Sequence, residues 1–410
     1  MSSHVAAVNV LLVIACASAI PLRAQTPVSR DSAVAAAVTS GGRLAIARAD
    51  TLVAFAGLVG ARAWPNPTLN ASYSKSPPTN HFIMDIPFEW PGQRGARIGA
   101  ARATRLAAQY RFAFERAGAA LDADTTYTRA VAARERAALS RHNAQEADSL
   151  RRMVAVRRGE GDASEMDVQL ATVTAGQAAN TAAADSLAYI SAVLDLQTVM
   201  GMAADRVEIE PSDSLTAPPE SLLARSDSGL TPRNAPPLQI AAAQASVEAA
   251  RLSLRSQHRN IFSAPSLSAG IESGDPDHPG LLPTFGIALP LPLFDRNRGG
   301  VMQARAEQAR AQAELTQATV QSHIEIARAK RELAIALGTV ERDRLLITAA
   351  TRVAAMSLTA YREGAASLPN VLEAQRSARE VLAQYIDDLA NAWIFAAELR
   401  VISLAPSDVP

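Results

Sequence analysis

The chain has little cysteine, few aromatic side chains and no excess of either charge. Its 410 residues include one cysteine, Cys16, and aromatic residues make up 4% of the sequence. Beyond residue 16 the chain can therefore form no disulfide framework, thiol nucleophile or cysteine metal site. The aromatic content is low for compact cores, and the formal net charge of zero argues against a nucleic-acid partner.

Sequence motifs that mark catalytic and nucleotide sites are also missing. The chain contains no Gly-x-x-x-x-Gly-Lys, no His-Glu-x-x-His and no Gly-x-Ser-x-Gly. A metal site needs convergent ligands, and no two of the later histidines are three or four residues apart: His81, His142, His258, His278 and His323. We expect no enzymatic activity, no cofactor and no dedicated metal site, so another protein must supply the energy for any transport.

The first 24 residues resemble an export signal. An apolar run from Val10 to Ile20 is too short to span a bilayer permanently. No lysine or arginine precedes this run, which departs from the usual pattern. We expect a signal peptide over residues 1–24 that is cleaved near Ala24. The alternative is a lipid-anchored end at Cys16, which follows Val-Ile-Ala.

What the chain does contain is an internal repeat. Phe82–Trp90 returns as Phe285–Leu293, about 203 residues later, and Gly161 and Ser164 return as Gly364 and Ser367 at the same offset. Such self-similarity predicts two copies of one structural unit. The chain then divides into a signal peptide at 1–24, a first repeat at 25–202, a Pro- and Ser-rich connecting segment at 203–237, and a second repeat at 238–410.

Each repeat contains two segments in which apolar and polar residues alternate. In the clearest one, Phe82, Met84 and Ile86 face one way while Asp85 and Glu89 face the other. Ten-residue alternating segments with an aromatic end are typical of outer-membrane strands. A soluble sheet with one buried face is the alternative, but nothing else in the chain covers four large apolar faces. The predicted strands are 67–74, 81–90, 265–273 and 284–293.

Long helices follow each strand pair. Residues 93–157 and 297–361 predict helices of about 90 Å. In the second one, Ile326, Leu333 and Val340 recur every seventh residue, which is typical of a coiled-coil seam. Shorter return helices are expected over residues 164–202 and 367–404, and an Ala-rich helix over 28–63 precedes the first strand. Because four strands cannot close a barrel in lipid, several copies must assemble.

Three segments carry a family resemblance: Pro65–Leu69, Leu289–Gly300 and Tyr361–Gln375. Over essentially its whole length after the signal, the chain resembles outer membrane efflux proteins of the TolC type. Leu289–Gly300 is most like the CzcC-like, heavy-metal efflux branch. The resemblance implies a mostly α fold with a small β part, in which long coiled-coil helices join four transmembrane strands per chain. Three copies would form a 12-stranded barrel on an α-helical tube.

The resemblance also implies a function and a location. The protein would lie in the outer membrane, with most of the chain in the periplasm, as the passive exit duct of a tripartite pump that exports heavy-metal cations. Its partners would be two further copies of itself, a periplasmic adaptor protein, an inner-membrane efflux pump and outer-membrane lipid. Two alternatives stay open. One is a channel for drug efflux or type I protein secretion, and the other is a periplasmic coiled-coil adaptor without a pore.

Two groups of residues are candidate functional sites. The turns at the far ends of the long helices are expected to dock the adaptor, and they contain Arg158, Gly161, Ser164, Arg362, Gly364 and Ser367. Glycine permits the helix reversal and serine caps the return helix, so only the arginines need a partner to explain them. Acidic and polar residues on the lumen side of the strands and near the tips are expected to line the conduit or its aperture: Asp85, Glu89, Glu272, Asp167, Asn370 and Glu373. Plain solvation of these groups is the alternative.

Overall fold

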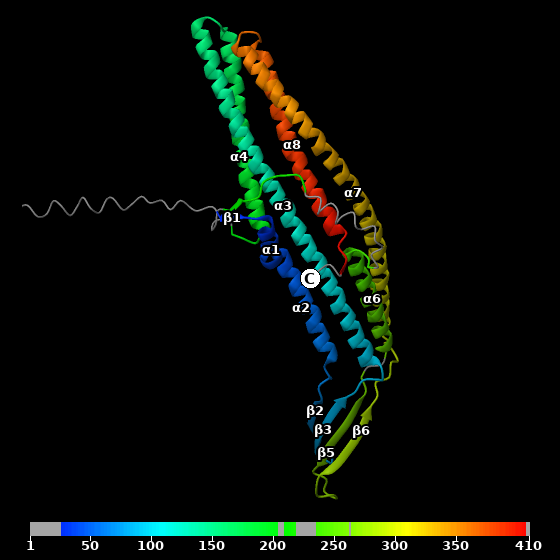
Figure 1. The fold of residues 1–410 in the computed structure, drawn as a ribbon. Helices are drawn as coiled ribbons and strands as arrows, with labels where there is room; N and C mark the ends of the chain where they lie inside the picture. Colours follow the sequence, from blue (N-terminus) through cyan, green and yellow to red (C-terminus); the bar gives the residue numbers. More distant parts are fainter. Residues whose placement is uncertain (1–25, 204–208, 219–234, 262–263, 407–410) are drawn as a thin grey trace, which may run out of the picture.

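A computed structural model describes residues 26–203, 209–218, 235–261 and 264–406. The predicted signal segment, with Cys16 in it, and part of the connecting segment lie outside the described residues. The molecule is elongated, with a small sheet at one end and the tips of two long helical hairpins at the other (Figure 1). This arrangement confirms a mostly helical fold with a small β part.

Two helical hairpins form most of the molecule. The first consists of α3 (Gln93–Glu160) and α4 (Glu165–Val199), and the second of α7 (Arg298–Arg362) and α8 (Leu368–Ile402). Helix α3 has 68 residues, which corresponds to about 100 Å. The equivalent hairpins come from equivalent parts of the two sequence repeats.

The predicted seam of α7 is buried against α8. Leu333 packs with Leu399 in one apolar cluster, and Val340 packs with Leu389 and Ala392 in the next. Many of the other buried positions in both hairpins are alanine. Small side chains of this kind let helices approach closely and favour helix formation, which explains how the hairpins pack with so few aromatic residues.

The sheet joins the two repeats. Its strand order is β2 (Thr68–Tyr73), β3 (Asn80–Pro87), β5 (Ser266–Ser273) and β6 (Leu282–Ala288), and all neighbours are antiparallel. The repeats meet where β3 pairs with β5, with Phe82 opposite Ile271. Strands β2 and β6 are the two outer strands, so each has an edge that no described strand covers.

Two strand predictions were too long. Strand β3 ends at Pro87 and β6 ends at Ala288, whereas the alternation had suggested ends at residues 90 and 293. Proline lacks the backbone N–H that a sheet ladder requires, and Pro290 and Pro292 follow β6 directly. Leu289, Leu291 and Leu293 therefore lie in the connection to α7 rather than in the sheet.

The N-terminal region forms two helices instead of one. Helix α1 (Arg30–Ser40) and helix α2 (Gly42–Arg62) are separated at Gly41, where a Cβ atom would lie 2.4 Å from the Ala37 carbonyl oxygen. Helix α2 is the one helix in the described segments that is long and apolar enough to cross a membrane. It packs lengthwise against α3 (Figure 1).

The remaining elements lie around the middle of the molecule. Helix α6 (Leu238–Arg259) packs between α3 and α7. Two short parallel strands, β1 (Thr26–Val28) and β4 (Ile209–Pro211), pair beside α3, and the sequence did not predict either of them. The Tyr127 hydroxyl donates to the Val28 carbonyl oxygen at 2.9 Å and so fastens β1 to α3.

Candidate functional site

The sheet has one polar face, built as the alternation predicted. On it, the Asp85 carboxylate accepts hydrogen bonds from Asn70 Nδ2 at 2.6 Å and from the Ser268 hydroxyl. Nearer the far end of the strands, His81 Nδ1 lies 3.2 Å from a Glu272 carboxylate oxygen. These contacts cross from β2 to β3 and from β3 to β5. The predicted lumen residues Asp85 and Glu272 therefore lie on the same face of the sheet, with Ile83 between them.

The opposite face of the sheet is apolar and uncovered in the single chain. Phe285 is 81% exposed, an extent that an ordinary apolar core residue does not reach. The other exposed apolar residues on this face come from all four strands: Leu69, Tyr73, Phe82, Met84, Ile86, Leu267, Ile271 and Ile287. An apolar patch of this size needs an apolar environment or a partner.

Glu89 was wrongly placed in the lumen. It lies beyond the end of β3, and its side chain is 9% exposed and forms an ion pair with Arg97 of α3. The same arginine donates to the carbonyl oxygens of Ala61 and Ala63. Glu89 therefore helps join the sheet to the helices.

The first tip closes as the sequence predicted. Gly161 has a φ of +90°, and it ends α3 with its N–H directed at the carbonyl oxygens of Arg157 and Arg158. Ser164 then caps α4 in a capping box, in which the Asp167 N–H donates to Ser164 Oγ at 3.1 Å. The Ser164 N–H donates in return to the Asp167 carboxylate at 3.0 Å. Asp167 thus has a structural role in the cap of α4, and its place at an aperture stays a prediction.

The second tip closes differently at its serine. Gly364 has a φ of +75°, as a helix reversal requires. Ser367 occupies the cap position of α8, but its side chain makes no capping hydrogen bond there. The predicted cap is therefore correct in position and wrong in its hydrogen bond. A proline, Pro369, stands in the first turn of α8, where its missing N–H costs nothing.

The remaining tip residues are exposed. Arg158 lies 3.4 Å from Glu165 across the turn, and about half of its side chain is exposed. Arg362 is exposed beside a groove between the two hairpins. Glu373 pairs with Arg376 one turn further along α8, and Asn370 is exposed. Arg158 and Arg362 are exposed residues in the last turns of α3 and α7, and the tips of the two hairpins lie at the same end of the molecule (Figure 1).

The sequence reasoning missed the contact that joins the two tips. Arg157 of α3 donates to the Tyr361 carbonyl oxygen of α7 at 2.6 Å, and its guanidinium lies 4.9 Å from the centre of the Tyr361 ring. Tyr361 belongs to an apolar cluster that includes Val154, Leu368 and Val371. In the sequence, Tyr361 was notable as the first residue of the Tyr361–Gln375 segment. The adjacent arginines at 157 and 158 gave no signal of which one turns inward.

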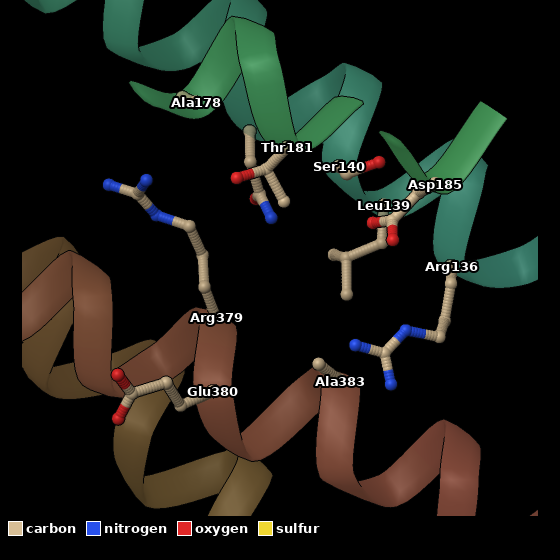
Figure 2. A pocket seen from close by; sticks show the side chains of 10 residues that line it. Arg136, Leu139, Ser140, Ala178, Thr181, Asp185, Arg379, Glu380 and Ala383 are labelled. Atoms are coloured by element: carbon tan, nitrogen blue, oxygen red, sulfur yellow. The ribbon is translucent and has the colours of Figure 1, made fainter. Parts of the chain in front are cut away.

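A mixed pocket of about 210 Å³ lies where α3, α4 and α8 meet. Figure 2 shows Ser140 and Asp185 on its α3 and α4 walls, and Arg379 reaching from α8 toward α4. Burial lowers the pKa of Arg379, although Glu146 partly offsets this effect. Across the described ranges, no three His, Cys, Asp or Glu side chains are grouped as metal ligands.

Two helices of different hairpins, α4 and α7, present exposed apolar stripes. Helix α4 packs against α3, whereas helix α7 packs against α8 and α6 (Figure 1). The stripe of α4 consists of Met166, Leu170, Val173, Leu187, Ile190 and Leu194. The stripe of α7 consists of Val320, Ile324, Ile335, Leu346, Val353 and Met356. Both stripes follow helical spacing, as expected for seams that a further helix would cover.

Two named proteins are related to the chain in sequence. It is 24% identical over 379 residues to the cobalt-zinc-cadmium resistance protein CzcC of Cupriavidus metallidurans, covering 91% of this chain and 89% of that protein. It is 28% identical over 268 residues to the nickel-cobalt-cadmium resistance protein NccC of Alcaligenes xylosoxydans xylosoxydans, covering 62% of this chain and 59% of that protein. No protein-family model matches the chain.

The fold is also found among solved structures. The Campylobacter jejuni CmeC outer membrane channel superposes with a TM-score of 0.76 at 14% sequence identity, covering 92% of this chain and 86% of that one. Sequence relatives and fold together confirm the resemblance to outer membrane efflux proteins of the TolC type, and the chain has the fold of their channels.

Proposed function

We propose that this chain is the passive outer-membrane exit duct of a tripartite efflux pump. The observation that carries the proposal is the four-stranded sheet, which exposes one apolar face and leaves the outer edges of β2 and β6 uncovered. Lipid would cover the apolar face. Uncovered edges in lipid would cost several kcal/mol per unsatisfied backbone group, so strands of further copies must pair with them.

Three copies fit this requirement best. Two copies would supply eight strands, and side chains fill the interior of an eight-stranded barrel. A barrel of twelve strands can leave an aqueous conduit. The apolar stripes of α4 and α7 support the same arrangement because they are two separate exposed surfaces, one on each hairpin. A contact between different surfaces repeats from copy to copy and closes into a ring. The polar sheet face with Asp85 and Glu272 would then line the conduit.

The direction of transport and its energy would come from partners. The sequence contains no nucleotide-binding motif, so an inner-membrane pump must drive export and a periplasmic adaptor must connect it to the duct. We assign adaptor docking to the hairpin tips, where Arg158 and Arg362 are accessible. Arginine at these points suits carboxylates or helix C-termini of a partner.

Heavy-metal cations are the proposed substrates. Both sequence relatives are named for resistance to divalent transition metals, including cobalt and cadmium. The Leu289–Gly300 segment resembles the same branch. Selection of the metal would occur in the pump, since passage through the duct requires no binding site.

The test combines conductance with resistance. Purified protein added to a planar bilayer should insert as a trimer and give stepwise conductance, whereas a periplasmic adaptor would give none. Deleting the gene should sensitise cells to cobalt, zinc and cadmium more than to hydrophobic drugs. Conductance without metal sensitivity would mean that the duct serves drug efflux or type I secretion instead of metal efflux. A monomer without conductance would overturn the proposal.

A further inference from the structure

Two aspartates face each other between the helices of the second hairpin. Asp343 of α7 is 7% exposed, and one of its carboxylate oxygens, Oδ2, is buried without a hydrogen-bond partner. The Asp388 side chain of α8 interacts with the Asp343 side chain, and Asp388 Oδ2 accepts a hydrogen bond from Gln384 Nε2 at 3.0 Å. The surrounding contact is apolar and contains Val340, Leu389 and Ala392. A buried carboxylate in such a place is costly unless it is paired or neutral.

The charged groups around Asp343 do not neutralise it. On its own helix, the Arg342 charge favours the ionised carboxylate, but this residue points toward solvent. On α8, Asp388 adds a second negative charge, while its neighbour Asp387 is already paired with Arg136 of α3. Burial first, and Asp388 second, raise the pKa of Asp343. Two carboxylates this close favour a state in which only one of them is charged.

The first hairpin provides an internal comparison. At the repeat offset of about 203 residues, Asp343 corresponds to Ser140 and Asp388 to Asp185. Ser140 is buried to a similar extent, at 5% exposed, and its hydroxyl donates to the Ala137 carbonyl oxygen at 3.4 Å. The first hairpin thus has a neutral, internally satisfied group opposite its aspartate. Only the second hairpin has two acids at this level.

We propose that Asp343 and Asp388 hold one proton between them and thereby make the contact of α7 with α8 sensitive to pH. With the proton present, one carboxyl group donates to the other and the apolar clusters on either side stay closed. When the proton leaves, two negative charges face each other across the contact and push the helices apart. The second hairpin, which includes the Arg362 tip, is then less stable than the first.

The raised pKa of Asp343 determines how folding stability changes with pH. A carboxyl group whose pKa is raised on folding contributes stability below its ordinary value of 3.8, and this contribution is lost as the pH rises through the folded-state pKa. The protein should therefore become less stable toward alkaline pH. Replacing Asp343 by the neutral, isosteric asparagine should remove that part of the pH dependence.

The experiment compares Asp343→Asn with Glu341→Gln, a change at an exposed acid two residues away that pairs with Arg344. Melting temperatures of the full-length protein are measured between about pH 5 and about pH 8. The melting temperatures of wild type and Glu341→Gln should fall as the pH rises. For Asp343→Asn this fall should be at most half as large. If Asp343→Asn does not fold, Asp388→Asn should show the same flattening.

Infrared spectroscopy supplies a second readout that a purely structural role would not change. The wild type should show the stretch of a protonated carboxyl at the acidic end of this pH range and lose it as the pH rises, and Asp343→Asn should lack that change. Equal pH slopes for wild type and Asp343→Asn would overturn the proposal. Stabilisation of wild type, but not of Asp343→Asn, by Ca²⁺ or Zn²⁺ at fixed pH would also overturn it, because the pair would then hold a cation instead of a proton.

Discussion

Arg157 of the first hairpin reaches across to the second, donating to the Tyr361 carbonyl oxygen at 2.6 Å with its guanidinium 4.9 Å from the ring centre. The two residues lie in the last turns of the long helices α3 and α7, so this one side chain links the tips of both repeats. Its neighbour Arg158 turns outward and pairs only with Glu165 of its own hairpin. Adjacent arginines thus have separate roles, one in packing and one at the surface.

The first prediction concerns this link. Arg157→Ala should destabilise the protein by about 2 kcal/mol, since it removes a charged hydrogen bond and a cation–π contact. Arg158→Ala should cost no more than about 0.5 kcal/mol, because exposed ion pairs contribute little. Urea unfolding of the two variants measures the difference. Equal effects would mean that the tips are held together by their apolar residues alone.

The second prediction concerns the two faces of the sheet. Met84, on the apolar face in the middle of β3, should not tolerate arginine, because a charge near the centre of the bilayer costs about 2–4 kcal/mol. Ser72→Arg, on the polar face of β2, should insert normally. Outer-membrane fractionation and heat-resistant trimer migration report the outcome. Normal insertion of Met84→Arg would show that this face does not contact lipid.

The third prediction concerns docking. Changing Arg158 and Arg362 together to glutamate should abolish efflux and crosslinking to the adaptor while expression, trimer formation and insertion are unchanged. The matched control changes Arg152 and Arg344, two exposed arginines away from the turns, to glutamate. The docking assignment is wrong if efflux survives the tip reversal or if the control pair loses it as well.

The fourth prediction concerns a buried carboxylate in the middle of the molecule. Asp124 of α3 is 3% exposed and pairs with both Arg30 and Arg400, the latter at 2.8 Å. Asp124→Ala should cost about 3 kcal/mol, because it leaves the half-buried Arg30 without a counter-charge. Asp122→Ala, which breaks only an exposed pair with Arg43, should cost less than about 1 kcal/mol. Denaturant midpoints distinguish the two.

The fifth prediction concerns pH. Burial, and then the charge of Glu332, raise the pKa of Glu398 on α8, although Arg129 partly opposes them. The stability that this group contributes is present below its ordinary value of 4.5 and is lost as pH rises through the folded-state pKa. Glu398→Gln should therefore raise the melting temperature at about pH 8 and leave it unchanged at about pH 4. A decrease at the higher pH would show that the ionised carboxylate stabilises the fold.

The repeat allowed much of the fold to be predicted. The large apolar residues at every second position of Phe82–Ile86 and the seven-residue spacing from Ile326 to Val340 depend only on which face of an element is apolar, and that is encoded locally. The ends of the elements were less predictable. The strands stop at Pro87 and Ala288 because the chain leaves the sheet there to reach the helices, although the alternation continues.

The sequence by itself determined the duplicated unit, the long helices, the apolar and polar faces of the sheet and the glycine turns, because each follows from local periodicity or backbone freedom. The tertiary structure decided which charged groups meet. Glu89 pairs with Arg97, Arg157 with Tyr361, and Asp343 faces Asp388. These contacts join residues of different elements or repeats, and their partners are set by how helices of about 100 Å align, which no local pattern encodes.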